Sequence, residues 1–216
     1  MNGSRFRRRL RYHLWILLGA LAGGMCLALA YDRPDLRNRL SAGSAYVALT
    51  CVALSLILGP LNLLRARPNP VSSDLRRDLG IWGGVVGLVH VGVGLTIHMH
   101  GKMLQYFLAA PESRGVLPIR IDVFGAANDL GLASAIVLLL LVLLSSDFSL
   151  RRLGTARWKF WQRMNYLGAI ALVGHGLLYQ FIEHRHLPFV VLLCVVIGIT
   201  LAFQFAGVRM VRLRAR

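Results

Sequence analysis

The chain has 216 residues, of which 56% are hydrophobic and 16% are charged. This composition is too apolar for an ordinary soluble domain. The formal net charge of +16 would suit a nucleic-acid-binding protein, but the basic residues lie at the ends of apolar runs, so we expect no nucleic acid and a lipid bilayer as the surrounding medium.

Six apolar runs follow one another along the chain. They are His13–Tyr31, Gly43–Leu64, Gly80–Met99, Ala126–Ser146, Tyr166–Glu183 and Leu187–Gly207. A hydrocarbon core about 30 Å thick requires about 20 apolar residues in a helix, and none of the runs alternates as a β-barrel strand does. The sequence therefore predicts an all-α integral membrane protein, a six-transmembrane-helix bundle that forms a single domain over residues 1–216.

The first run has a second interpretation. It follows several arginines and ends near Ala28-Leu29-Ala30, which resembles the cleavage site of a secretory signal peptide. The run is long for such a signal, and six spans explain the charge pattern without cleavage.

Lys and Arg alternate between the two sides of the predicted bundle. Eighteen of them lie in the N-terminal segment, the second-to-third loop, the fourth-to-fifth loop and the C-terminal tail, and seven lie in the other three loops. Cytoplasmic loops carry the excess of basic residues in membrane proteins, so we expect both termini to be cytoplasmic.

Two connecting segments have a character of their own. Residues 102–125 form the longest loop on the outer side, and residues 146–165 are basic and aromatic, which predicts a segment along the inner interface with Trp158 and Trp161 as anchors. Asn128 and Asp129 open the fourth run and are expected to cap its helix.

Two histidines lie in the middle of separate apolar runs. His90 follows Arg77 by 13 residues, and His175 follows Arg163 by 12 residues, so both lie about 18–20 Å along their helices. Ionisable side chains at such depth are costly and mark functional sites. Two neutral imidazoles at matching depth are the usual axial ligands of a b-type haem, so the pair predicts haem b and electron transfer across the membrane.

Small residues share the helix faces of both histidines. Positions i−7, i−3 and i+4 are Gly83, Gly87 and Gly94 around His90, and Gly168, Leu172 and Tyr179 around His175. Glycines at these positions leave room for a flat macrocycle, although close helix packing uses the same pattern. The combination with a mid-membrane histidine favours a haem pocket.

Three segments of the chain carry recognisable short motifs. They are Arg76 to Ile81 followed by His90, Ser145 to Asp147 with Leu150 to Gly154, and Trp158 to Tyr166 leading to His175. They resemble, in this order, the RRxLGL…LH motif, the end of the fourth span and the WxxLHRLxY…H motif of the ferric reductase-like transmembrane family, and within it the haem-binding membrane subunits of bacterial periplasmic methionine sulfoxide reductase systems. The resemblance covers roughly residues 45–208, which we take as the core of the domain.

The resemblance implies a pathway for electrons. They would pass from a cytoplasmic flavin reductase or a membrane quinol, through haem b held by His90 and His175, to a periplasmic oxidoreductase, in the inner membrane of a bacterium. It also makes FMN or a quinone candidates for a further cofactor. The chain departs from the family at Gln162, where the family has a histidine, and this argues against a second haem, or the family's inner site where electrons enter, at that position.

Further basic side chains are weaker candidates. Four histidines near the outer ends of the third and fifth runs are considered for a second haem or a surface metal: His98, His100, His184 and His186. The sequence offsets of His98 and His184 from the inner pair place them on other helix faces than that pair. We therefore favour the interpretation that these histidines only lie at the membrane interface. Arg77 and Arg163 would pair with haem propionates that point inward. The alternative is that they only reflect the excess of basic residues on the cytoplasmic side.

A non-redox membrane protein is the alternative function. The histidines would then serve a transporter, a proton relay or a scaffold subunit without haem. Transporters more often have broken helices and paired carboxylates within their spans, whereas these runs hold almost no acidic residue in their middle thirds. The sequence therefore favours haem-dependent electron transfer.

Overall fold

Seven α-helices account for most of the residues that the structure, a computed structural model, describes; these residues are 3–67, 73–109 and 118–214. The helices are α1 (Gly3–Ala30), α2 (Leu36–Leu64), α3 (Asp74–Gly94), α4 (Val123–Leu144), α5 (Asp147–Gln162), α6 (Met164–Ile182) and α7 (Leu187–Arg214). Two short 3-10 helices, η1 (Met99–Gly101) and η2 (Met103–Tyr106), follow α3.

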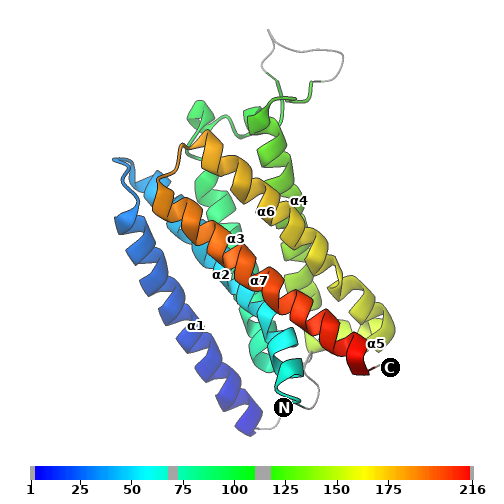
Figure 1. The fold of residues 1–216 in the computed structure, drawn as a ribbon. Helices are drawn as coiled ribbons and strands as arrows, with labels where there is room; N and C mark the ends of the chain where they lie inside the picture. The colour runs from blue at the N-terminus through cyan, green and yellow to red at the C-terminus, as the bar shows by residue number, and fades with distance from the viewer. Residues whose placement is uncertain (1–2, 68–72, 110–117, 215–216) are drawn as a thin grey trace.

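Six of these helices coincide with the six predicted runs, and α5 is the additional one. It occupies the basic and aromatic segment predicted at the inner interface, and it lies at the end of the bundle where both termini lie (Figure 1). The helix bends at Gly154, whose φ of +71° favours glycine.

The third helix ends earlier than predicted. It ends at Gly94, whereas the apolar run continues to Met99. The Tyr106 hydroxyl donates to the Gly94 carbonyl at 2.8 Å, and the Thr96 hydroxyl donates to the Val93 carbonyl at 2.6 Å. These side chains supply partners to carbonyls that a helix end leaves free, which allows α3 to stop inside the apolar run.

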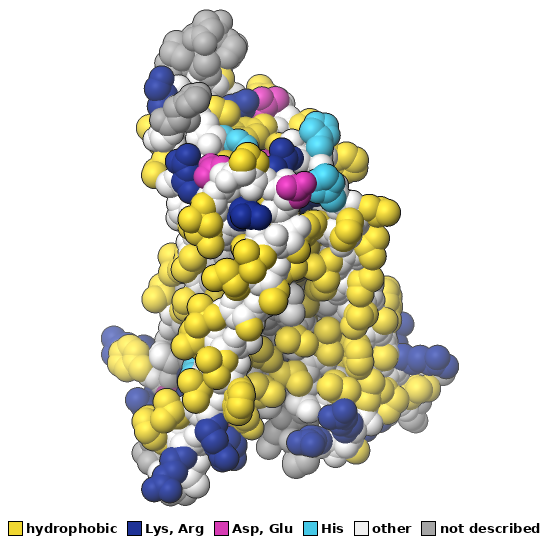
Figure 2. Space-filling model, turned by 90° about the vertical axis from the view of Figure 1, so that its left-hand side faces the viewer, with side chains coloured by type: hydrophobic (Ala, Val, Ile, Leu, Met, Phe, Trp, Pro, Cys, Tyr) yellow, Lys and Arg dark blue, Asp and Glu magenta, His cyan; other side chains and the backbone are white. Residues whose placement is uncertain are grey.

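The surface of the bundle is apolar over its middle. Four helices, α1, α2, α4 and α7, are long and apolar enough to cross a membrane, and among the described residues α3 and α6, the two histidine helices, fall outside this set. Figure 2 shows an apolar belt between an end rich in Lys and Arg and an end where basic, acidic and histidine side chains mix. Large side chains in this belt such as Ile170 and Phe205 are 70% and 73% exposed. Exposure of so much apolar surface is costly in water but not in lipid. The chain thus has the surface of a multi-pass membrane protein.

The helices pack through small residues. α2 contacts α1, α3 and α7, while α4 contacts α3 and α6. A Cβ atom on Gly83 would lie 2.8 Å from the Val52 side chain of α2, and one on Gly168 would lie 2.8 Å from the Val137 side chain of α4. Such close approaches are typical of helix pairs in membranes, where packing rather than the hydrophobic effect drives association.

The end of the bundle that carries both termini, called the basic end here, is held by ion pairs between α1 and α3. Arg5 Nη2 lies 2.8 Å from Asp74 Oδ1, and Arg9 pairs with Asp78, whose side chain is fully buried. The hydrogen bond from Arg5 lowers the pKa of Asp74 to about 2. These ion pairs attach α1 to the rest of the bundle.

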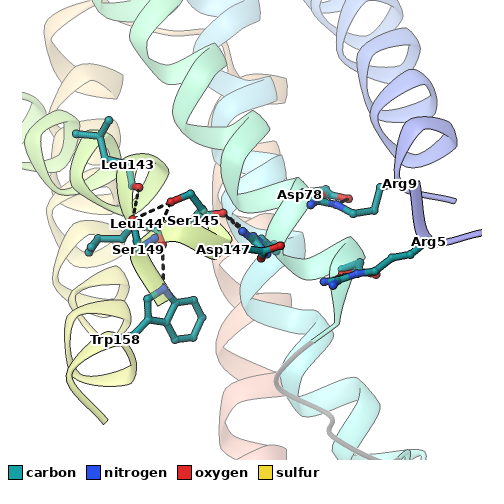
Figure 3. A network of polar contacts seen from close by, with 12 residues as sticks. Arg5, Arg9, Asp78, Leu143, Leu144, Ser145, Asp147, Ser149 and Trp158 are labelled. Carbon is teal, nitrogen blue, oxygen red and sulfur yellow. Dashed lines mark hydrogen bonds and ion pairs between the residues drawn. The ribbon is translucent and has the colours of Figure 1, made fainter. Parts of the chain in front are cut away.

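A second set of polar contacts at the basic end joins α3 to α4 and α5 (Figure 3). Arg77 Nη1 lies 2.7 Å from Asp147 Oδ1, and the same guanidinium donates to the Ser145 carbonyl at the end of α4. Its hydrogen bond lowers the pKa of Asp147. Trp158 Nε1 donates to the Leu144 carbonyl at 2.9 Å, so this predicted interfacial anchor also caps α4.

Candidate functional site

His90 of α3 and His175 of α6 meet inside the bundle. Their ring centroids are 6.1 Å apart and their planes are inclined by 72°. The two residues are 85 positions apart in the chain, and α3 and α6 both rise from the basic end. The similar distances of the histidines from inner arginines, which predicted matching depth, therefore correspond to two rings that meet inside the bundle.

Both imidazoles are oriented by backbone carbonyls. His90 Nδ1 lies 3.0 Å from the Ser41 carbonyl oxygen and 3.2 Å from the Ser41 hydroxyl, both on α2. His175 Nδ1 lies 2.8 Å from the Ala127 carbonyl oxygen on α4. A carbonyl oxygen only accepts, so each Nδ1 carries the proton and each Nε2 keeps its lone pair.

This arrangement is the one that metal-binding histidines adopt. A ligating imidazole usually donates its other N–H to a carbonyl or carboxylate, which fixes its tautomer and raises its basicity. Among the described residues, no protein hydrogen bond engages Nε2 of either ring. Both nitrogens are therefore free to bind a ligand.

The separation of the rings can be compared with that of two imidazoles bound to one metal ion. A metal–imidazole bond is about 2 Å long and the ring centroid lies about 1 Å behind the nitrogen, so two imidazoles on opposite sides of one ion have centroids about 6 Å apart. The observed centroid distance of 6.1 Å is close to this value. Two histidines alone are few ligands for a bare metal ion, whereas a haem would bring a macrocycle that supplies the other ligands of its iron.

An apolar cavity of about 190 Å³ adjoins the histidines between α2, α3, α4 and α6. Leu88, Leu132 and Leu138 are among its lining residues, and a second cavity of about 80 Å³ continues from the same two histidines toward His98 and Glu183. Pockets that enclose drug-sized molecules begin at roughly 300 Å³, so this cavity is smaller than a macrocycle would require. The chemistry of the lining suits a large apolar ligand.

Gly131 of α4 permits the position of His175. A Cβ atom at this glycine would lie 2.7 Å from His175 Nδ1 and 2.9 Å from its Cε1. Real Cβ atoms do not approach other atoms so closely, so any larger residue at 131 would displace the ring from the Ala127 carbonyl. This glycine was not among the predicted site residues.

The predicted glycines divide into two groups. Gly87 and Gly94 line the larger cavity, as expected for a pocket beside His90. Gly83 packs on Val52 and Gly168 packs on Val137, and neither borders a cavity in the described part of the chain. For these two the structure shows close helix packing, the other interpretation of small residues on a helix face.

Polar groups surround the histidines on the side away from the basic end. The Tyr179 ring lies 4.7 Å from the His175 ring, and its hydroxyl donates to Asn128 Oδ1 at 2.8 Å. Asn128 therefore bonds to a neighbouring helix, and the expectation that it caps α4 is wrong, because α4 begins earlier and Asp122 accepts from the Gly125 N–H at 2.7 Å as the cap. Ser134 borders the larger cavity, and its buried hydroxyl has no partner among the described residues.

The arginines near the cavity differ from the predicted ones. Arg77 is engaged with Asp147 and Ser145 at the basic end, and Arg163 has an exposed side chain. Neither lines a cavity in the described structure. Arg185, in the loop between α6 and α7, lines both cavities, and its loop position gave no periodic signal in the sequence.

The remaining histidines do not form a second site like the first. His98 Nε2 lies 2.8 Å from Glu183 Oε1, and because α3 ends at Gly94, the helical rotation inferred for His98 does not apply. His184 and His186 are exposed, while the side chain of His100 lies outside the described residues. Within the described residues there is no group of three or more His, Cys, Asp or Glu that could hold a metal ion.

Gln162, where the chain departs from the family pattern, ends α5. Its Nε2 is buried without a hydrogen-bond partner among the described residues, and so is Oδ1 of Asn165. The glutamine is thus at the basic end and away from the histidine pair.

Comparison with known proteins adds no further assignment. No protein-family model matches the chain, and no curated protein matches it. The resemblance to ferric reductase-like proteins therefore rests on the three short motifs, and the site has to be interpreted from its own geometry.

Proposed function

We propose that the protein is a b-type haem-binding membrane electron-transfer protein, in which His90 and His175 would hold the haem iron. The observation that carries this proposal is the meeting of two imidazoles at 6.1 Å, each with Nδ1 engaged by a backbone carbonyl. A haem bound by these residues would supply one-electron redox chemistry.

The residues around the pair would favour this chemistry in three ways. The carbonyls of Ser41 and Ala127 hold both rings in the tautomer that leaves Nε2 available. Apolar lining residues exclude water from the iron-binding position, which sets the local dielectric and hence the potential. Gly87, Gly94 and Gly131 leave space beside the rings that larger side chains would fill.

The proposal places all six long helices across a bilayer, with the basic end on the cytoplasmic side. Four helices meet the length and hydropathy that a span requires, and α3 and α6 lie beside them with glycine and histidine facing the interior, where a less apolar helix is tolerated. The excess of arginine at the basic end gives the orientation. By resemblance, the membrane is the inner membrane of a bacterium.

The partners in this proposal follow from topology. The chain offers no glycine-rich dinucleotide fingerprint outside its apolar runs, so a cytoplasmic flavin reductase or a membrane quinol would supply electrons. A periplasmic oxidoreductase would accept them, in keeping with the resemblance.

Proton relay is the competing function. It is favoured by the second cavity, which leads from the histidine pair to His98 and Glu183. On the other side, toward the basic end, the larger cavity is lined by residues such as Gly84, Leu88 and Leu138, which offer no titratable group. A relay that crosses the membrane needs titratable groups or water on both sides, so the apolar side favours electron transfer.

A visible absorption spectrum tests the proposal. The full chain would be purified in detergent from haem-replete cells and measured before and after dithionite reduction. We expect a sharp Soret band that shifts on reduction, with resolved α and β bands of low-spin haem. A colourless protein would contradict the proposal and favour the relay.

A further inference from the structure

Arg185 is a cation placed at the edge of the candidate haem site. It lies in the short loop between α6 and α7, and it borders both cavities together with His90 and His175. Its guanidinium carbon lies 5.6 Å from the Tyr31 ring centroid and 5.5 Å from that of Tyr46. The two aromatic rings hold the guanidinium through cation–π contacts and fix where it points.

One donor of this guanidinium, Nε, is buried without an acceptor among the described residues. Glu183 borders the smaller cavity with Arg185 and lies close enough to act on it electrostatically, but the Glu183 carboxylate is hydrogen-bonded to His98 at 2.8 Å. A buried N–H without an acceptor is costly, so an acceptor from a bound ligand would remove this cost.

The arginines of the basic end differ from Arg185 in their partners. Arg5, Arg9 and Arg77 all pair with carboxylates of the same chain, and Arg77 is the one among them that was expected to contact the cofactor. Their charges are already compensated. Arg185 therefore has both the position and the unused donors to bind a ligand's anionic group.

We propose that Arg185 binds a carboxylate of the cofactor, so that the carboxylate edge of the macrocycle faces the α6–α7 loop and not the basic end. A guanidinium presents paired N–H donors that match a carboxylate in a bidentate manner. This inference rests on the proposed function, since it assigns the orientation of a haem in the same site. It replaces the inward orientation that Arg77 and Arg163 would have required.

The test compares haemin with its dimethyl ester, which lacks both negative charges and is otherwise the same macrocycle. The full chain, produced in a haem-deficient host and purified in detergent, is titrated with each compound, and the Soret band reports binding. We expect the unmodified protein to bind haemin about tenfold more tightly than the diester, the amount that a charge-assisted hydrogen bond supplies. In Arg185→Gln, this preference should fall to within about twofold, because the amide is uncharged.

Two further variants keep the test decisive. Arg185→Lys retains the charge and should retain part of the preference, and a preserved elution profile in size-exclusion chromatography shows that each variant is folded. Arg163→Gln removes an exposed arginine at the basic end and should behave as the unmodified protein does. The midpoint potential gives a second readout, which should be lower in Arg185→Gln because a positive charge near the iron favours the ferrous state.

The outcomes separate this inference from the proposed function. Binding of haemin with an unchanged preference in Arg185→Gln would overturn the inference alone, and it is also the result expected if Arg185 binds a lipid phosphate instead. Loss of the preference in Arg163→Gln would show that the carboxylates face the basic end. Failure of the unmodified protein to bind either compound would overturn the proposed function, and this inference with it.

Discussion

The two ends of the bundle use arginine in different ways. At the basic end, Arg9 and Arg77 pair with Asp78 and Asp147 and tie α1 to α3 and α3 to α5. At the other end, Arg185 borders the cavities with a buried Nε that has no partner among the described residues. Paired arginines stabilise the fold, whereas an arginine left with free donors beside a cavity is available to a ligand. The histidine pair lies between the two regions.

The largest effect is expected at the two histidines, which lie between these two regions. His90→Ala and His175→Ala each remove one of the two axial ligands, so each should abolish retention of haem b through purification. His98→Ala, which alters a histidine paired with Glu183, is the control and should keep its haem. A pyridine haemochrome assay on the purified proteins measures the haem content, and retention of haem by either inner variant would refute the assignment of that ligand.

Breaking an ion pair at the basic end should affect stability and leave the site intact. Asp78→Ala leaves Arg9 without its fully buried partner, and loss of one member of a buried pair costs about 3 kcal/mol. We expect a lower midpoint of unfolding, measured by circular dichroism in detergent, with an unchanged haem spectrum in the folded protein.

Asp35→Asn is the matched control for this variant. Asp35 forms an exposed pair with Arg37, and such pairs contribute about 0–1 kcal/mol, while asparagine preserves the helix cap. Equal destabilisation by the two substitutions would show that the buried pair has no special part in joining α1 to α3.

Gly131→Ala tests whether the carbonyl partner of His175 matters. The added Cβ would fall 2.7 Å from Nδ1, so the ring must leave the Ala127 carbonyl. Loss of such a partner typically costs at least tenfold in metal affinity, so haemin should bind about tenfold more weakly. Gly198→Ala adds the same methyl group on α7, where no atom lies within 4 Å, and should bind normally; a similar loss there would mean that the effect of Gly131→Ala is not local.

The smallest effect concerns pH and the pair between α1 and α3. Asp74 has a pKa of about 2 in the folded chain because Arg5 hydrogen-bonds to it, whereas an unfolded aspartate has a pKa of about 3.9. The folded state therefore gains stability from this group above about pH 4 and loses it as the pH falls toward 2. Unfolding midpoints between pH 2 and 6 should show this decline, and Asp74→Asn should reduce it; an identical acid profile in the variant would show that other groups cause the decline.

The sequence predicted the helices and the histidine pair because both are governed by simple periodic rules. Long apolar runs identify helices, and distance from an inner arginine identifies depth. The end of α3 was mispredicted because Tyr106, from a separate segment, supplies the hydrogen bond that lets the helix stop. The residue pattern within one apolar run contains no information about a hydrogen-bond partner that comes from another segment.

The rest of the site could not be predicted from the sequence, for related reasons. The partners of both histidines are backbone carbonyls, which every residue type possesses, so no residue choice marks them. Gly83 shares the face of His90 but lies seven residues, or about 10 Å, away along the axis, where it meets Val52 and not the cavity. Arg185 lies in a loop, where no periodicity applies.

Low-temperature electron paramagnetic resonance of the oxidised, purified protein reports whether both histidines bind one iron. Two imidazoles on one iron predict a low-spin ferric signal that disappears in His90→Ala and in His175→Ala and persists in His98→Ala. A high-spin signal in the unmodified protein, a low-spin signal that survives either inner substitution, or the absence of iron would contradict the account.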